Sequence, residues 1–191
     1  MDSRLIAWGR VVKRRRQGSP ALWFFTDEHR LPDPLPVIRR LPVGLCGVVF
    51  RHDNHPDRAA LAKQVARICR ARRLALIVAG DARLAVALGA GLHLRGNGPV
   101  GGGNRGLRSA SAHNAAQMAR ARRAGADLVF ISPIFPTATH PGASGLGVLG
   151  WLKLARRAGR VKPCGLGGIT GQHVRALPAW CAGAGAIDAF L

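Results

Sequence analysis

Short apolar runs of strand length alternate with helical segments along most of the chain after Pro20. Two of the helical segments, 58–73 (RAALAKQVARICRARR) and 114–126 (NAAQMARARRAGA), repeat apolar residues at helical spacing. Gly125 is placed to end the second helix in a left-handed conformation. The runs of strand length are eight in number and lie at 22–26, 47–50, 74–79, 91–94, 107–112, 127–132, 162–168 and 186–191.

Strict alternation of strands and helices predicts an α/β fold with parallel strands. Such a chain either closes into a (β/α)8 TIM barrel or spreads into a doubly wound sheet. The barrel is favoured, because eight strands are its closure number and no G-x-G-x-x-G motif opens the first helix. We expect a shortened barrel, since segment 95–106 is too rich in glycine for a good helix and the eighth run, 186–191, leaves no covering helix after it.

The length and apolar content favour one domain. With 191 residues and 48% hydrophobic content, the chain can bury one full core. We assign residues 21–191 to the barrel and residues 1–20 to a basic N-terminal segment. The run KRRR at 13–16 predicts a solvated basic arm, although the segment could also cover part of the gap left by the missing last helix.

The chain is strongly basic, with 29 Lys and Arg against 9 Asp and Glu and a formal net charge of +20. Such a balance indicates nucleic acid, an acidic partner or an anionic substrate. Because only four of the 29 are Lys, a general compositional bias toward Arg explains the charge better than specific nucleic-acid binding does. The N-terminus lacks the features of a secretory signal and no run reaches the length of a membrane span, so we expect a cytoplasmic protein without a membrane partner.

The four cysteines, Cys46, Cys69, Cys164 and Cys181, form no C-x-x-C pair. We expect reduced thiols rather than disulfides or a metal site.

Two loops after predicted strands are suited to binding small anions. The first, ISPIFPTATHPGASGLG (131–147), is rich in hydroxyls and bare backbone, and the second is GLGGIT (165–170). Gly167 and Gly168 would let backbone N–H groups approach an anion closely. In a barrel the loops after the strands, including the one after strand seven, form the active face.

The order of several motifs resembles the thiamine phosphate synthase family, which includes the TenI-type thiazole tautomerases. The motifs are LWFFTD (22–27), GLHL (91–94), SAHN (111–114), GADLVFISPIFPTATH (125–140) and GLGGIT (165–170). The resemblance implies a (β/α)8 barrel that joins a hydroxymethylpyrimidine pyrophosphate to a thiazole phosphate, forming thiamine phosphate and pyrophosphate. It also implies that pyrophosphate departs with Mg²⁺, so Mg²⁺ is the expected cofactor if the protein is active and no cofactor is expected otherwise.

The resemblance also implies a set of site residues. Those expected to act in catalysis are Arg51, Ser111, Thr137, Thr139 and His140, and those expected to bind substrate are Arg51, Ser111, His113, Thr137, Thr139, Gly167, Gly168 and Asp188. For the serine and the threonines the alternative is local turn capping. For His113 it is a helix-leading or core histidine.

The expected metal ligands are missing from this set. The metal-binding Asn-Asp after strand three falls on Ala79 and Gly80, with Asp81 one place late, and the second carboxylate falls in 95–103, which holds no acid. Asp81 is the one possible ligand, and no metal site is predicted with it alone.

Other departures change the charge of the expected anion site. Asp53 stands where the family has the Lys of R-x-K, His140 replaces the Lys of F-P-T-x-T-K, and Asp188 replaces a small Ser that meets the thiazole phosphate. We predict that Asp188 fills the anion site, either accepting from the amides of Gly167 and Gly168 or pairing with a nearby Arg. A tautomerase is disfavoured, because Pro133 stands where such enzymes can carry a catalytic His.

Three functions follow, and the departures leave open whether the protein is an enzyme. The first is a thiamine phosphate synthase-like enzyme of thiamine biosynthesis, acting on phosphorylated pyrimidine and thiazole substrates. The alternative is a non-catalytic or regulatory ligand-binding barrel of the same family. The second alternative is a basic protein that binds RNA or anions on its surface.

Overall fold

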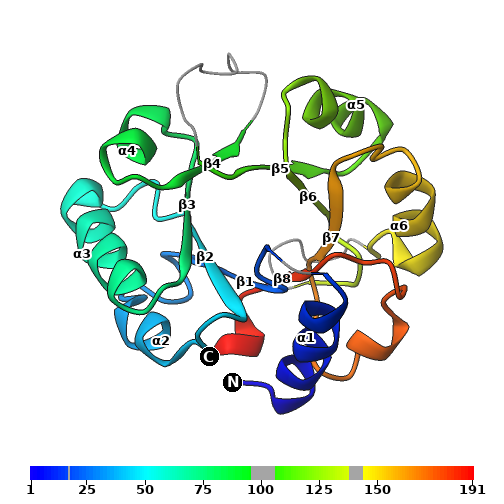
Figure 1. Cartoon of the computed structure of the whole chain (residues 1–191), viewed down its shortest axis with the longest axis horizontal. Helices are drawn as coiled ribbons and strands as arrows, with labels where there is room; N and C mark the ends of the chain where they lie inside the picture. Colours follow the sequence, from blue (N-terminus) through cyan, green and yellow to red (C-terminus); the bar gives the residue numbers. More distant parts are fainter. Residues whose placement is uncertain (17, 96–105, 138–143) are drawn as a thin grey trace.

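The strands close into a barrel, as predicted. A computed structural model describes residues 1–16, 18–95, 106–137 and 144–191. Eight parallel strands pair in sequence order, and β1 pairs with β8 to complete the ring. Figure 1 shows the helices outside this ring. The strands are β1 (Leu22–Phe25), β2 (Cys46–Phe50), β3 (Ala75–Ala79), β4 (Gly91–Leu94), β5 (Arg108–Ala112), β6 (Leu128–Ile131), β7 (Lys162–Leu166) and β8 (Ala184–Ala186).

Alternate side chains of the strands point into the barrel or toward the surrounding helices. In β1, Trp23 and Phe25 belong to the cluster inside the barrel, whereas Leu22 and Phe24 belong to the cluster under the helices. Phe130 of β6 meets Phe25 edge-on inside the barrel, with ring centroids 4.8 Å apart. The lumen is therefore packed with aromatic side chains, and a ligand can bind only above them, at the strand ends.

Within the described ranges, helices follow most of the strands on the outside. They are α2 (Leu35–Arg40), α3 (Arg58–Ala71), α4 (Ala82–Ala87), α5 (Ala115–Arg123), α6 (Gly147–Ala155) and η1 (Val174–Ala176). Helices α3 and α5 confirm the two segments predicted from apolar spacing. Asp57 and Asn114 cap their first turns, and Gly125 has the positive φ, 64°, expected of a helix-ending glycine.

The eighth strand was predicted in the wrong place. It is Ala184–Ala186, not 186–191, and residues Asp188–Phe190 form a 3₁₀ helix, η2. A strand of small residues fits here because a Cβ on Gly185 would lie 2.6 Å from the ring of Phe25. Phe190, which suggested a strand by its apolarity, packs outside the barrel against Phe24 at 5.7 Å.

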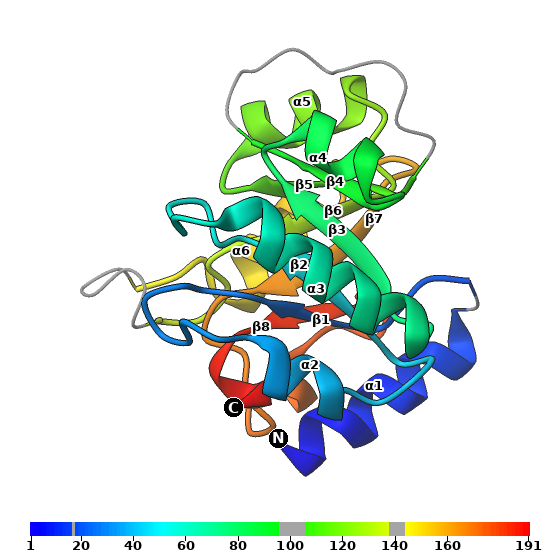
Figure 2. The same ribbon diagram turned by 90° about the vertical axis from the view of Figure 1, so that its left-hand side faces the viewer.

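The basic N-terminal segment is not a solvated arm. Residues Ser3–Arg15 form helix α1, which buries Leu5 and Val12 and is capped by Asp2. A Cβ on Gly9 of α1 would lie 2.7 Å from Leu22 of β1, so the helix packs closely on the barrel wall. In Figure 2 it runs beneath the barrel, beside both chain ends. The segment therefore packs on the barrel wall.

Some predictions fall outside the residues that the structure describes. The glycine-rich segment predicted to lack a helix lies mostly within 96–105, and the end of the first anion loop lies within 138–143. All four cysteines are buried free thiols. Within the described ranges, none of the helices combines the length and apolarity needed to cross a membrane.

Candidate functional site

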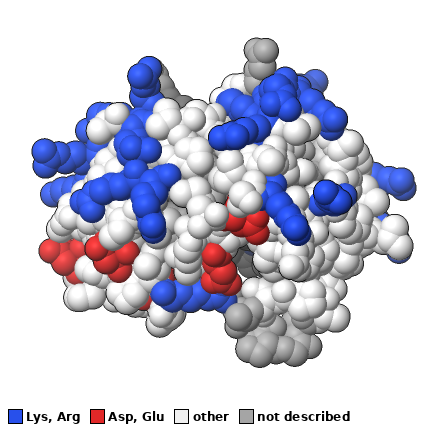
Figure 3. Space-filling view, turned by 90° about the horizontal axis from the view of Figure 1, so that it is seen from below, with Lys and Arg blue, Asp and Glu red and all other residues white. Residues whose placement is uncertain are grey.

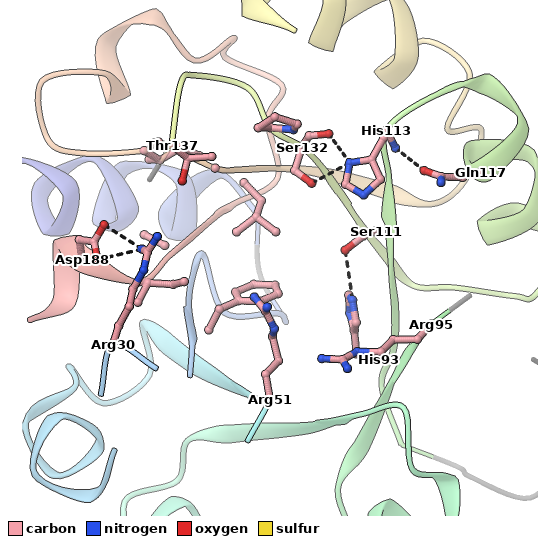
Figure 4. Close-up of a pocket in the computed structure, with 18 of the residues that line it drawn as sticks. Arg30, Arg51, His93, Arg95, Ser111, His113, Gln117, Ser132, Thr137 and Asp188 are labelled. Atoms are coloured by element: carbon pink, nitrogen blue, oxygen red, sulfur yellow. Dashed lines mark hydrogen bonds and ion pairs between the residues drawn. The ribbon is translucent and has the colours of Figure 1, made fainter. Parts of the chain in front are cut away.

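A cavity of about 650 Å³ lies at the carboxyl ends of the strands. Its lining comes from most of the strand ends and the loops that follow them, as Figure 4 shows for ten labelled residues. Four residues predicted to share one mouth of the barrel, Ser111, Thr137, Gly167 and Gly168, all line it. Thr139 and His140, which were predicted beside them, lie outside the described residues.

The glycine pair after β7 forms a bare backbone wall of this cavity. Gly167 and Gly168 have positive φ angles of 89° and 64°. Ile134 and Phe135 donate their N–H groups to the carbonyls of Leu166 and Gly167, at 2.9 and 3.2 Å, which joins the two anion loops. Within the described part of the chain, no group accepts from the N–H of either glycine. Two N–H donors are thus available to a ligand.

Arg51 brings a cation into the middle of the cavity. Its backbone N–H donates to Oγ1 of the buried Thr26 at 2.8 Å, which fixes the residue at the end of β2. Its guanidinium lies over the ring of Phe25, 5.9 Å from the centroid, and has no hydrogen-bond acceptor among the described residues. Burial lowers the pKa of Arg51, and the neighbouring charge of Arg95 lowers it further. A guanidinium with donors but no acceptor is an anion-binding group.

Ser111 of β5 is held by a buried histidine. Nε2 of His93 lies 3.1 Å from Oγ of Ser111, and Nδ1 lies 2.8 Å from Oγ of the buried Ser109. Burial lowers the pKa of His93 to about 3, and the charges of Arg95 and Arg51 act in the same direction. The imidazole is therefore neutral at physiological pH and has one donor and one acceptor nitrogen.

The side chain of His113 is hydrogen-bonded to the loop after β6. Its Nδ1 lies 2.5 Å from the carbonyl oxygen of Ser132, and its backbone N–H donates to Oε1 of Gln117 at 2.6 Å. The residue lines the cavity and is exposed, so it is not a core histidine. Thr137 lies on the opposite wall, as Figure 4 shows.

Asp188 does not occupy the amides of the glycine pair. Both of its carboxylate oxygens accept from Nη1 of Arg30, at 3.0 Å, and 64% of its side chain is exposed. Of the two predicted arrangements, pairing with an Arg is the one found. The carboxylate lies on the cavity rim in η2, and not in a strand, because β8 ends two residues earlier.

The carboxylates nearest the expected metal position are engaged by arginines. Arg58 donates to Oδ2 of Asp81 at 3.1 Å and to Oδ1 of Asp53 at 3.3 Å, and Arg95 pairs with the other oxygen of Asp53. Asp81 also caps α4 by accepting from the N–H of Leu84 at 2.8 Å. Residues 1–16, 18–95, 106–137 and 144–191 contain no group of three or more His, Cys, Asp or Glu that could hold a metal ion.

Sequence reasoning missed several cationic and polar residues of the site. Arg95 follows β4 directly, so the rule that strand ends carry the site could have found it. Arg30 and Gln117 also line the cavity, but neither directly follows a strand, and no sequence signal marked them. His93 belongs to a motif already noted, yet its contact with Ser111 depends on the register of β4 and β5.

Positive charge is spread over the surface as well as gathered in the cavity. On the face drawn in Figure 3, Lys and Arg side chains are scattered among uncharged residues and form no single stripe. A nucleic-acid track is expected to gather its cations along one path. That face therefore does not favour the RNA-binding alternative.

The comparisons with known proteins agree with one another. The family described as thiamine monophosphate synthase (TMP-TENI) matches residues 26–187. A thiamine-phosphate synthase of Geobacillus thermodenitrificans is 34% identical over 131 residues, covering 63% of this chain and 58% of that protein. One of Bacillus velezensis is 33% identical over 124 residues, covering 61% and 55%. The matches thus span little more than half the length of these relatives.

A solved structure shares the fold. The thiamine phosphate pyrophosphorylase from Pyrococcus furiosus superimposes with a TM-score of 0.74 over 87% of this chain and 84% of that chain. The sequence identity is 22%, so this likeness concerns the architecture alone.

Proposed function

The chain belongs to the thiamine monophosphate synthase family, and from this premise we propose that it joins a hydroxymethylpyrimidine pyrophosphate to a thiazole phosphate, forming thiamine phosphate and releasing pyrophosphate. The two relatives described above are thiamine-phosphate synthases. Substrates of this class are phosphorylated heterocycles, which suit a cavity with an aromatic floor and cationic walls. We propose a cytoplasmic location for the same biosynthetic role.

The observation that carries this proposal is that the guanidinium of Arg51, which has no hydrogen-bond acceptor among the described residues, lines the same cavity as the open amides of Gly167 and Gly168. A phosphoryl group placed between them would receive donors from two sides. The arrangement costs stability in the unliganded protein, since a desolvated cation without an acceptor is unfavourable. A binding role accounts for that cost.

The reaction that the family resemblance implies breaks a carbon–oxygen bond early and leaves a pyrimidine cation beside a departing pyrophosphate. Negative charge grows on the bridging oxygen as the bond breaks, and fixed donors aimed at that oxygen lower the barrier. We assign this task to Arg51, with Arg95 at the cavity edge as a second cation. Phe25, below Arg51, offers an apolar face for a heterocycle.

Ser111 is proposed to donate to the same anion through a defined hydrogen-bond chain. If the Ser109 hydroxyl donates to Nδ1 of His93, then Nε2–H donates to Oγ of Ser111. The Ser111 hydroxyl is then left to donate into the cavity. A neutral His93 is required for this chain, and its lowered pKa keeps it neutral.

The Mg²⁺ that the family implies does not fit the residues present. Asp81 and Asp53 already neutralise Arg58 and Arg95, and Asp81 caps a helix as well. All nine acidic residues of the chain lie in described positions, and segment 96–105 contains no further carboxylate. We therefore derive no step of the reaction through a metal.

The proposal is tested by incubating the protein with both substrates and measuring thiamine phosphate and pyrophosphate. Equal amounts of the two products are expected, and Arg51→Met should abolish them. Binding of both substrates without product would favour the alternative, a regulatory barrel. Failure to bind either substrate would reject the assignment to this pathway.

A further inference from the structure

Four oxygen atoms from two separate segments, 52–53 and 79–81, converge on the guanidinium of Arg58. Its Nε donates to the carbonyl of His52 at 3.1 Å, and Nη2 donates to the carbonyl of Ala79 at 2.8 Å. The carboxylates of Asp81 and Asp53 take the other two directions, at 3.1 and 3.3 Å. We call these five residues the Arg58 network. It ties the end of β3 and the start of α4 to the loop after β2.

Oxygens from two carboxylates and two carbonyls are the donor set that a hard divalent cation accepts in proteins. Here a guanidinium occupies the centre of that set, with 18% of its side chain exposed, and packs over the ring of Phe50 at 5.8 Å. A guanidinium keeps its charge at any physiological pH and needs no metal supply. The network lies where the resemblance places metal ligands, at the end of β3.

The network extends into the cavity through Asp53. One oxygen of Asp53 accepts from Arg58 and the other from Arg95, and both Asp53 and Arg95 line the cavity. The two carboxylates of the network neutralise two of the three nearby guanidinium groups, Arg58, Arg95 and Arg51. One positive charge is left over, and it faces the cavity.

From this geometry we propose that Arg58 is a built-in substitute for a divalent cation, so that the cavity binds a diphosphate without metal through Arg51 and Arg95. Arg58 is a positioning residue, because it acts on the ligand through Asp53 and Arg95. The proposal rests on the proposed function, since it takes the diphosphate to be the leaving group of that reaction. It departs from the family pattern, because the resemblance to the family implies that the pyrophosphate leaves together with Mg²⁺.

The test uses inorganic pyrophosphate as the probe and isothermal titration calorimetry of the full chain, first in EDTA and then in excess Mg²⁺. We expect binding in EDTA that Mg²⁺ tightens by no more than about threefold. Arg58→Ala should weaken binding in EDTA by about tenfold or more, and Mg²⁺ should recover part of the loss through the freed carboxylates. Arg67→Ala removes an exposed arginine from the same helix and should change neither value.

The outcomes separate this inference from the proposed function. Wild-type binding that Mg²⁺ tightens by more than about tenfold would overturn the substitution by Arg58 and leave the proposed function standing. Undiminished binding by Arg58→Ala in EDTA would also overturn it, and the wild-type comparison decides the question even if that variant does not fold. Absence of binding under both conditions would overturn both, whereas metal-free binding without any thiamine phosphate product would reject the proposed function alone.

Discussion

Asp188 and Arg30 form a two-oxygen ion pair across the rim of the cavity, with both carboxylate oxygens 3.0 Å from Nη1 (Figure 4). The pair joins η2, near the C-terminus, to the loop after β1. It places a carboxylate beside a cavity that is otherwise lined by arginines and N–H donors. The carboxylate both repels an incoming phosphate and neutralises a cation that could attract it.

Replacing Asp188 with Ser should therefore tighten phosphate binding. The substitution removes one negative charge and the ion pair that Asp188 forms with Arg30. Because 64% of the Asp188 side chain is exposed, solvent screens the effect, and we expect a gain of about two- to fivefold in affinity for thiazole phosphate. Calorimetry on the wild type and the variant measures it.

The double variant Asp188→Ser/Arg30→Gln is the control for this prediction. If the gain comes from the released charge of Arg30, the double variant should bind no better than the wild type. An equal gain in the single and double variants would assign the effect to repulsion by Asp188 alone. Unchanged affinity in both would show that the rim does not contact the ligand.

Replacing Arg51 with Met should separate binding from stability. Met keeps most of the side-chain volume and removes a half-buried cation that has no hydrogen-bond acceptor among the described residues. We expect pyrophosphate binding to be lost, while the free energy of unfolding stays level or rises by about 1 kcal/mol. Urea unfolding together with calorimetry tests both parts. A marked loss of stability would mean that Arg51 holds the fold rather than a ligand.

Most of the fold could be predicted from the sequence because its elements are local. Seven strands and helices α3 and α5 carry their own apolar period, caps and end signals, as the caps Asp57 and Asn114 illustrate. The eighth strand carries no such signal. Its small residues, including Gly185, fit the space left by Phe25 of the first strand, and a contact between distant segments is invisible in a local pattern.

The candidate site could be predicted only in part for the same reason. Ser111 lies near the end of β5 and the glycine pair directly follows β7, so the barrel topology brings them together. The engagement of Asp53 and Asp81 by Arg58 depends on where a long side chain from α3 ends. Helix α1 also had a signal, since Asp2 caps a segment in which Leu5 and Val12 lie on one face, but the run of basic residues obscured it.

His93 predicts a dependence of stability on pH. Its pKa is about 3 in the folded protein and near 6.5 when unfolded. Between these values the unfolded state binds a proton that the folded state does not, so stability is lost as the pH falls. Each pH unit below about 6.5 should cost about 1.4 kcal/mol from this residue. Urea unfolding of His93→Gln across this range should show a shallower slope than the wild type.

His29→Gln is the matched control, because it makes the same replacement at an exposed histidine. The pKa of the buried His52 is also lowered by burial. It contributes with the same sign in all three proteins and cancels in the comparison. Identical slopes for the wild type and His93→Gln would contradict a neutral buried His93.

Alanine substitutions at Gly168 and Gly89 can separate two costs at the anion loop, the steric clash of an added Cβ and the backbone strain of a positive φ. Gly168 and Gly89 have nearly the same φ, 64° and 61°, but a Cβ on Gly168 would meet the carbonyl oxygen of Pro136 and lie 2.8 Å from Cβ of Phe135, whereas Gly89 has nothing within 4 Å. Alanine at Gly89 should cost about 1 kcal/mol of the free energy of unfolding, from the positive φ alone, and leave binding intact.

Gly168→Ala adds the clash to the same backbone strain, so it should cost about 2–4 kcal/mol of the free energy of unfolding. The N–H of Phe135 also donates to the carbonyl of Gly167, and this bond joins the two anion loops. Relief of the clash must therefore move both loops and misplace the amide donors. We expect pyrophosphate affinity to fall by about tenfold or more. Urea unfolding and calorimetry on both variants measure the two effects. Equal costs for the two alanines, or wild-type affinity in Gly168→Ala, would show that this loop neither packs nor binds as described.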